Sequence, residues 1–143
     1  MIETDVATSI RMGRIRQRDT EPERVIRSWL WSRGLRYRIC DRKLPGSPDI
    51  ANRSSKWAVF VHGCFWHDHR NCPAATKPKR NAGFWAEKIS ANAVRDRRKR
   101  EALEALNFDV AVVWECEAKA LRKTGRPPAS LNRFLRRLDR ARQ

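Results

Sequence analysis

No stretch of the sequence approaches the roughly 20 apolar residues that a membrane-spanning helix requires. The first residues, Met1 to Asp5, lack a cationic start followed by an apolar run, so a signal peptide is not expected. Internal repeats and low-complexity linkers are also missing from the sequence. These absences exclude a membrane span and predict a cytoplasmic protein without a membrane partner.

Acidic side chains are scarce, since 16 Asp and Glu stand against 32 Lys and Arg and give a formal net charge of +16. Such an excess favours a polyanionic partner because phosphate contacts release condensed counterions, but it does not distinguish DNA, RNA and an acidic membrane surface. The 143 residues, 41% of them hydrophobic, fit one domain with an apolar core. Residues 1–18, with four arginines and few apolar groups, predict a basic N-terminal arm, and residues 19–143 form the predicted domain.

Cysteine is limited to four residues, which in a reducing cytosol favour metal ligation or free thiols over disulfides. Cys64, His69 and Cys72 lie within nine residues, and Cys116 follows an apolar stretch that predicts a buried strand. A Cys₃His set suits tetrahedral Zn²⁺, and because protein fills all four positions the site is expected to be structural rather than catalytic. Spacing alone leaves open whether His69 or His67 is the histidine ligand.

Helical signals occur in three places. Thr20 to Glu23 combines a hydroxyl N-cap, a proline in the first turn and a glutamate three residues on, which predicts a helix start, and Gly34 suits its C-terminal cap. A long helix is predicted from about Gly83 to Leu106, and the spacing of the apolar residues from Leu131 to Leu138 predicts a C-terminal helix.

Strand signals lie between these helices. Residues 35–39 alternate apolar and basic side chains and predict a half-buried strand, followed by Cys40, which we interpret as a small buried hydrophobe. Residues 52–55 resemble a hairpin turn, and the stretches 57–61 and 108–114 are apolar on both faces and predict buried strands. The long helix between these two supplies a right-handed crossover, so we expect them to pair in parallel. The fold class is therefore α/β: a single domain with a mixed central β-sheet flanked by helices.

A nuclease-like pattern surrounds the predicted hairpin. Many nucleases hold Mg²⁺ with an Asp on one strand and an acidic-x-Lys triplet on the next. Here Asp49 precedes the hairpin, and Phe60 and His62 take the outer triplet positions on one face of the strand. The second carboxylate is missing, so the backbone carbonyl of Val61 is the expected second ligand. By pattern alone, Asp49 after Pro48 is equally well a turn residue.

Several ordered motifs resemble the very-short-patch-repair (Vsr) DNA mismatch endonuclease family. The resemblance extends from about Met12 to about Cys116, and it is carried by Val61-His62-Gly63-Cys64-Phe65-Trp66-His67, by Pro48-Asp49 before it, and by Phe84-Trp85, Arg95-Asp96-Arg97-Arg98 and Val113-Trp114-Glu115-Cys116 after it. It implies a restriction-endonuclease-like fold with a structural zinc bound by Cys64, His69, Cys72 and Cys116. Val61 stands where the family has Thr, a change that a backbone ligand tolerates.

The resemblance also implies a catalytic centre. Asp49 would ligate Mg²⁺ with help from the Val61 carbonyl. His67 would serve as general base, oriented by Asp96. His62 would contact the scissile phosphate or assist the leaving oxygen. An imidazole near its unperturbed pKa can take a proton at neutral pH, which is consistent with these roles.

Glu23 would anchor a metal-bound water. The implied reaction is a Mg²⁺-dependent nick 5′ to the thymine of a T:G mismatch, with Phe65, Trp66 and Trp85 wedged into the base stack and the arm, through Met12, clamping the opposite groove. Mismatched double-stranded DNA and DNA repair proteins are the implied partners, in the nucleoid. A single centre cutting one strand predicts a monomer.

Plainer interpretations stay open for several residues. Glu23 also completes a capping box, and Asp96, flanked by arginines, also suits a surface ion pair. Phe65, Trp66 and Trp85 also suit a protein core. Two other functions compete with mismatch repair: a nickase of the same scaffold directed at modified or invading DNA in a defence system, and a non-catalytic, zinc-stabilised DNA-binding module.

Overall fold

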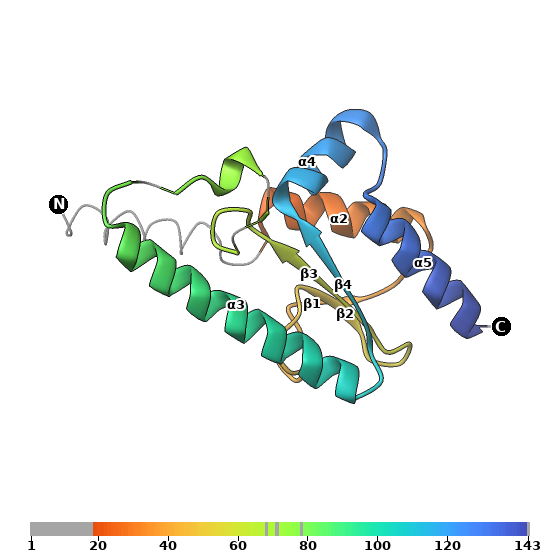
Figure 1. Ribbon diagram of the computed structural model, residues 1–143. Helices are drawn as coiled ribbons and strands as arrows, with labels where there is room; N and C mark the ends of the chain where they lie inside the picture. The colour runs from red at the N-terminus through yellow and green to blue at the C-terminus, as the bar shows by residue number, and fades with distance from the viewer. Residues whose placement is uncertain (1–18, 68, 71, 78, 143) are drawn as a thin grey trace.

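The computed structural model describes residues 19–67, 69–70, 72–77 and 79–142. The predicted basic arm, with Met12, lies outside the described residues. The elements follow one another along the chain as shown in Figure 1: α2 (Glu21–Ser32), β1 (Arg38–Ile39), β2 (Ile50–Asn52), β3 (Trp57–His62), the 3₁₀ turn η1 (Pro73–Ala75), α3 (Ala82–Ala105), β4 (Asp109–Trp114), α4 (Glu115–Thr124) and α5 (Ala129–Arg142).

The four strands form one mixed sheet in the order β1-β2-β3-β4. β1, β2 and β3 pair antiparallel, joined between β2 and β3 by the predicted hairpin turn. β3 and β4 pair in parallel, with a register that runs from Trp57 opposite Asp109 to His62 opposite Trp114. The crossover between them is α3, so the predicted parallel pairing is confirmed, and both strands end at the same edge of the sheet.

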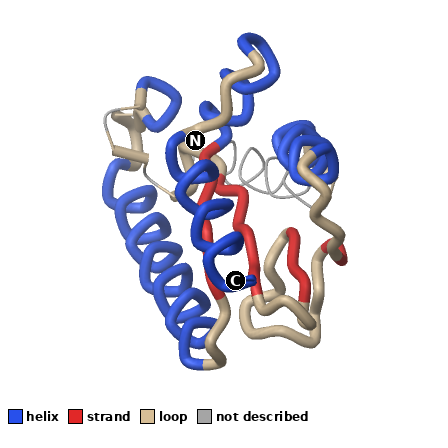
Figure 2. The backbone as a smooth tube through the Cα atoms, turned by 90° about the vertical axis from the view of Figure 1, so that its right-hand side faces the viewer, coloured by secondary structure: helices blue, strands red, loops and turns tan. Residues whose placement is uncertain are grey.

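Helices cover both faces of this sheet. In Figure 1, α3 lies on one side of the strands and α2, α4 and α5 on the other, and the side view of Figure 2 shows α3 running along the strands. The larger core lies between the sheet and α2, α4 and α5 and is formed by Ile26, Leu30, Leu35, Ile50, Trp57, Val59, Ala111, Val113, Ala118, Leu121, Leu131, Phe134 and Leu138. The smaller core lies under α3 and is formed by Leu44, Ala51, Ala58, Phe60, Leu103 and Phe108. The result is the predicted α/β sandwich.

The helix boundaries agree with their sequence signals. Thr20 is the N-cap of α2, and its hydroxyl accepts a hydrogen bond of 3.5 Å from the backbone N–H of Glu23. Gly34, with a φ of +84°, follows the helix in the left-handed region that favours glycine. None of the described helices is both long enough and apolar enough to cross a membrane.

Two details of the prediction are wrong, and one helix was not predicted. The strand predicted at 35–39 is reduced to the two residues of β1, and Ile39 is 50% exposed because β1 is the edge of the sheet. Cys40, interpreted as buried, is only partly so, and its φ of +48° ends the strand. Helix α4 was not predicted, because it follows β4 without a loop and buries only Ala118 and Leu121.

Candidate active site and metal centre

Four soft donors gather beyond the carboxyl ends of β3 and β4. One ligand atom from each of Cys64, His69, Cys72 and Cys116 lies within 4.8 Å of all the others. The Cys116 Sγ and the His69 Nδ1 are 3.4 Å apart. Donors on a tetrahedral Zn²⁺ lie about 3.5–3.8 Å apart, so the number, type and spacing of these groups fit that ion. His69, and not His67, is the histidine of this cluster.

Backbone hydrogen bonds shape the loop that carries three of these donors. The N–H of His69 donates to the Cys64 carbonyl at 3.0 Å, and the N–H of Cys72 donates to the His69 carbonyl at 3.3 Å. Cys64 is fully buried at the start of the loop. Cys116 comes from the first turn of α4, which starts where β4 ends. The parallel strand pair therefore brings the distant thiol to the loop.

The thiols of this cluster influence one another. Burial and the neighbouring thiols of Cys64 and Cys72 raise the pKa of Cys116 to about 12. Burial also raises the pKa of Cys64. For Cys72, burial is outweighed by hydrogen bonds from the Ala74 backbone and the other thiols, and its pKa is lowered. A bound Zn²⁺ would lower the pKa of all three thiols, because the metal binds the thiolate form.

The four side chains Cys64, His69, Cys72 and Cys116 are called the metal cluster. A cavity of about 710 Å³ lies beside this cluster and is lined by His67 and Glu115, neighbours of its ligands in the sequence. Its walls come from the start of α2, the loop before β2, the end of β3 with the loop after it, the middle of α3, and α4. The residues singled out as catalytic all line it: Glu23, Asp49, His62, His67 and Asp96. Segments far apart in the sequence thus contribute to one cavity.

Two imidazoles stand together in this cavity. The rings of His62 and His67 stack with centroids 3.9 Å apart and planes 7° apart. The Nδ1 of His67 hydrogen-bonds to Oδ2 of Asp96, on the face of α3 that points inward. Burial raises the pKa of Asp96, but the bond to His67 and nearby positive charges outweigh it, so the pKa lies below its ordinary value. A carboxylate held ionised on Nδ1 fixes the ring and turns Nε2 toward other partners.

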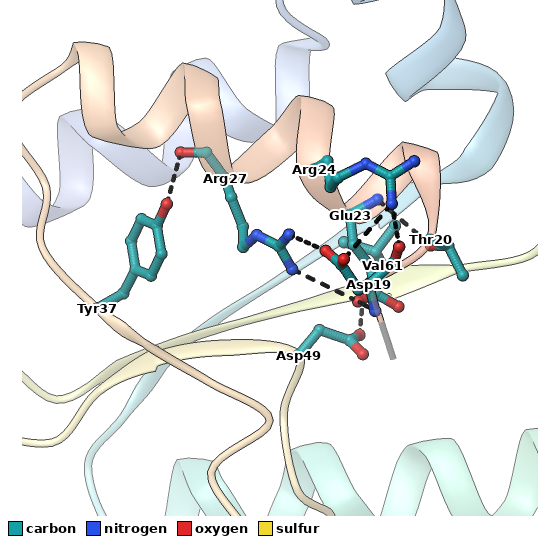
Figure 3. A network of polar contacts seen from close by, with 8 residues as sticks. All are labelled: Asp19, Thr20, Glu23, Arg24, Arg27, Tyr37, Asp49 and Val61. Atoms are coloured by element: carbon teal, nitrogen blue, oxygen red, sulfur yellow. Dashed lines mark hydrogen bonds and ion pairs between the residues drawn. The ribbon is translucent and has the colours of Figure 1, made fainter. Parts of the chain in front are cut away.

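Asp49 lines the same cavity from the loop before β2. Its Oδ2 accepts a hydrogen bond of 2.7 Å from the backbone N–H of Val61 (Figure 3). Its carbonyl accepts from the N–H of Cys40 at 3.0 Å, which continues the pairing of β1 with β2. The carboxylate is thereby held against the backbone of β3, next to the carbonyl that the sequence suggests as a second oxygen ligand.

Glu23 is buried at the first turn of α2, with 6% of its surface exposed. Its Oε2 accepts from the backbone N–H of Asp19 at 3.0 Å and lies 3.9 Å from Arg27 (Figure 3). Thus Glu23 has a structural role at the helix start and also faces the cavity.

A second group could also hold a metal: one ligand atom each from His62, His67 and Asp96 lies within 4.8 Å of the others. Two imidazoles with one carboxylate suit a transition metal better than Mg²⁺, which prefers oxygen ligands. Because Asp96 is bonded to His67, the geometry also suits an acid–base pair without a metal. The oxygen donors for a hard cation are on the Asp49 side of the cavity.

The three expected wedge aromatics form one cluster. The ring centroids of Phe65, Trp66 and Trp85 lie 5.1 to 5.7 Å apart, in edge-to-face contacts. Trp66 and Trp85 are each 3% exposed, whereas the adjacent Phe84 is 42% exposed. As they stand, the two indoles are packed in the protein, so insertion between bases requires this cluster to open.

Several residues at the site were missed by sequence reasoning. Lys99 lines the cavity, and its stem packs so tightly on Gly46 that a Cβ there would lie 2.5 Å from it. Lys119 and Arg122 line the cavity from α4, and Arg122 forms an ion pair with Glu21 of α2. The signals for α4 were present: two glutamates in its first turn, basic residues in its last turn and Gly125 after it.

Comparison with known proteins agrees with the resemblance read from the motifs. The sequence profile described as DNA mismatch endonuclease Vsr matches residues 2–73. The Type II nicking enzyme V.XorIIP of Xanthomonas oryzae is 46% identical over 110 residues, which cover 77% of this chain and 80% of that protein. The DNA mismatch endonuclease Vsr of Escherichia coli K12 is 41% identical over 120 residues, covering 83% of this chain and 76% of that protein.

A further relative, the Type II nicking enzyme V.NmeAIP of Neisseria meningitidis, is 42% identical over 120 residues, or 81% of this chain and 85% of that protein. Identity at this level over most of both chains leaves no room for a chance likeness of short motifs. The chain therefore belongs to the Vsr DNA mismatch endonuclease family and is an endodeoxyribonuclease, a hydrolase of phosphodiester bonds.

Proposed function

We propose that this enzyme nicks one strand of double-stranded DNA, 5′ to the thymine of a T:G mismatch, in a Mg²⁺-dependent reaction of very short patch repair. The observation that carries the proposal is the single cavity lined by Glu23, Asp49, His62, His67 and Asp96. Its support outside the structure is the family itself, whose relatives include a DNA mismatch endonuclease and nicking enzymes.

The donors near Asp49 suit magnesium. The Asp49 carboxylate lies against the backbone of Val61, and the carboxylate of Glu23 faces the same cavity. Carboxylate and carbonyl oxygens with water are the ligands that Mg²⁺ prefers. Asp49 and the Val61 carbonyl would bind the ion directly and Glu23 through a water. The bound ion would supply positive charge against the negative charge that develops on the phosphate.

His67 takes the proton of the attacking water in this proposal. Asp96 holds Nδ1, so that the ring presents Nε2 to the water and the positive charge formed on the ring is stabilised. His62, stacked on His67 at 3.9 Å, contacts the scissile phosphate or the leaving oxygen. In this proposal His67 acts on the attacking water and His62 acts on the phosphate.

DNA is held by charge and opened by aromatic rings. The net charge of +16 favours the duplex, and Lys99, Arg95 and Lys119 bring cations to the cavity itself. Phe65, Trp66 and Trp85 would enter the base stack, which costs a few kcal/mol per step and less where pairing is already poor. The lower cost at a T:G pair favours mismatched over matched DNA.

The proposal also covers the fold class, the N-terminal arm and the oligomeric state. The sheet with its parallel β3–β4 pair would be of the restriction-endonuclease-like class. Residues 1–18, through Met12, would clamp the groove opposite the cut, with residues 19–143 as the endonuclease domain. The enzyme would act as a monomer and pass the nick to DNA repair proteins, because one centre cuts only one strand.

The test is nicking of matched and T:G-mismatched duplexes with Mg²⁺, followed separately on each strand. The proposal expects cleavage of the thymine strand, 5′ to the mismatched base, and little cleavage of the matched duplex. Equal nicking of both duplexes would instead favour a nickase directed at modified or invading DNA. Binding of both duplexes without cleavage under any divalent metal would favour the non-catalytic module.

A further inference from the structure

One indole contacts every histidine of the chain. The sequence holds three histidines, and the Trp114 ring lies against all of them, with centroid distances of 4.1 Å to His69, 5.3 Å to His62 and 6.4 Å to His67. His69 belongs to the metal cluster, and His62 and His67 belong to the cavity. Trp114 therefore stands between the two centres.

The contacts differ in geometry. Trp114 and His69 stack in parallel, with planes 6° apart, whereas His62 meets the indole edge-on, with planes 77° apart. His62 in turn stacks on His67, whose Nδ1 is bonded to Asp96. A continuous series of ring contacts thus runs from the metal cluster to the acid–base pair.

The backbone of Trp114 is fixed from two sides. It is the last residue of β4, opposite His62 in the parallel register. It is also the N-cap of α4, and its N–H donates to Oε1 of Glu117 at 2.9 Å. A ring on so firmly held a backbone can act as a reference surface for its neighbours, because aromatic contacts of this kind have preferred angles and distances.

We propose that Trp114 is a positioning residue that sets the orientation of His62, and through it His67, relative to the metal cluster. The inference rests on the proposed roles of these two imidazoles. A ring that merely filled space would be needed for stability alone; a positioning ring is needed for the rate of the chemical step. Misplacing catalytic groups by about 1 Å can cost on the order of 100-fold in rate.

The main test replaces Trp114 by Leu, which removes the ring. Single-turnover nicking should slow by roughly 10- to 100-fold, while DNA affinity and zinc content stay at the wild-type level. Trp114→Phe, which keeps a smaller ring, should recover most of the rate. Trp31→Leu is the matched control, because Trp31 is 52% exposed and contacts Tyr37 far from the cavity; it should nick at the wild-type rate.

A readout without DNA makes the test independent of activity. Since the chain has only three histidines, their imidazole proton signals can be followed by nuclear magnetic resonance. In Trp114→Leu the nuclear Overhauser effect between the ring protons of His62 and His67, whose rings stack at 3.9 Å, should weaken because His62 turns away. An unchanged effect between the two rings, with zinc bound, would overturn the proposal.

A double-mutant comparison separates this inference from the proposed function. If Trp114 acts through His62, adding Trp114→Leu to His62→Ala should slow nicking hardly further. An inactive His62→Ala beside a fully active Trp114→Leu would overturn the inference alone, whereas a fully active His62→Ala would contradict the proposed function first. Trp114→Met repeats the test with an unbranched, more flexible side chain of similar volume. Zinc loss from both the Leu and Met variants would also overturn the inference, because Trp114 would then serve the metal cluster only.

Discussion

The two ends of the parallel pair β3–β4 differ sharply in chemistry. At the carboxyl ends, where His62 faces Trp114, lie the metal cluster, the stacked imidazoles and the cavity. At the amino ends, where Trp57 faces Asp109, an indole packs edge-on against Phe134 with centroids 5.7 Å apart. The polar contact there is an ion pair between Asp109 and Arg137 on the surface.

The difference follows from the direction of the strands. Because α3 carries the chain back to the start of the sheet, both strands deliver their following residues to one edge, and functional groups of open α/β sheets gather at such edges. The larger core contains only hydrophobic side chains, and the candidate functional groups lie outside it. Asp49 joins the functional edge from the antiparallel β2, whose start lies opposite the end of β3.

The largest effect is expected from Asp49→Ala at the functional edge. Removing the carboxylate of the proposed Mg²⁺ site should lower the nicking rate by about 1000-fold or more, with folding and DNA binding largely intact. Asp109→Ala is the matched control at the opposite end of the strands and should nick normally. Single-turnover rates of both variants decide; an active Asp49→Ala would refute the metal assignment.

The next largest effect concerns His67 and Asp96, the proposed acid–base pair. His67→Ala should slow nicking by roughly 100- to 10,000-fold, the range of a positioned general base. Asp96→Asn, which keeps the shape but not the charge that holds Nδ1, should slow it less. Comparable rates for His67→Ala and wild type at saturating DNA would contradict the role of His67.

Zinc binding should require Cys116 but not Cys40. Cys116→Ala removes a donor from the cluster, so it should release zinc and lower the melting temperature on the order of 10 °C or unfold the protein. Cys40→Ala, outside the cluster, should keep both zinc content and melting temperature near wild type. Metal analysis and thermal unfolding of the two variants measure these effects. Equal zinc content in both variants would show that Cys116 is not a zinc ligand.

The smallest effect is expected at the amino ends. Arg137 donates to both carboxylate oxygens of Asp109 at 2.8 to 3.0 Å, and Asp109 raises the pKa of Arg137 by hydrogen bonding, but the guanidinium is 44% exposed. Water screens such a pair, so Arg137→Ala should reduce the free energy of unfolding by less than about 1 kcal/mol. Urea unfolding measures it. A loss of nicking in this variant would contradict the view that the amino ends of β3 and β4 have no part in catalysis.

Much of the scaffold could be predicted because its signals are local. Thr20 and Glu23 mark the start of α2 by their spacing, and the apolar stretches 57–61 and 108–114, separated by a helix, predict a parallel pair. The same pairing predicts that Cys116 meets the loop cysteines. Fold class and metal cluster thus followed from patterns that lie in one segment or in two segments with a known connection.

The rest depends on contacts that no local pattern contains. Whether Trp66 and Trp85 are buried is decided by the packing of α3 on an irregular loop, where periodicity gives no signal. The position of Trp114 among the three histidines requires the exact strand register. The length of the edge strand β1 was predicted wrongly because the alternation in residues 35–39 indicates a strand but not where its pairing partner ends.

We propose that the carboxyl ends of β3 and β4 hold two separate centres, one closed by zinc ligands and one open to DNA. Nicking of a T:G duplex, measured while Mg²⁺ is removed and restored and zinc content is determined on the same samples, tests it most directly. Activity should disappear when Mg²⁺ is removed and return when it is restored, while zinc stays bound. Nicking that persists without Mg²⁺, or that follows the zinc content instead, would contradict it.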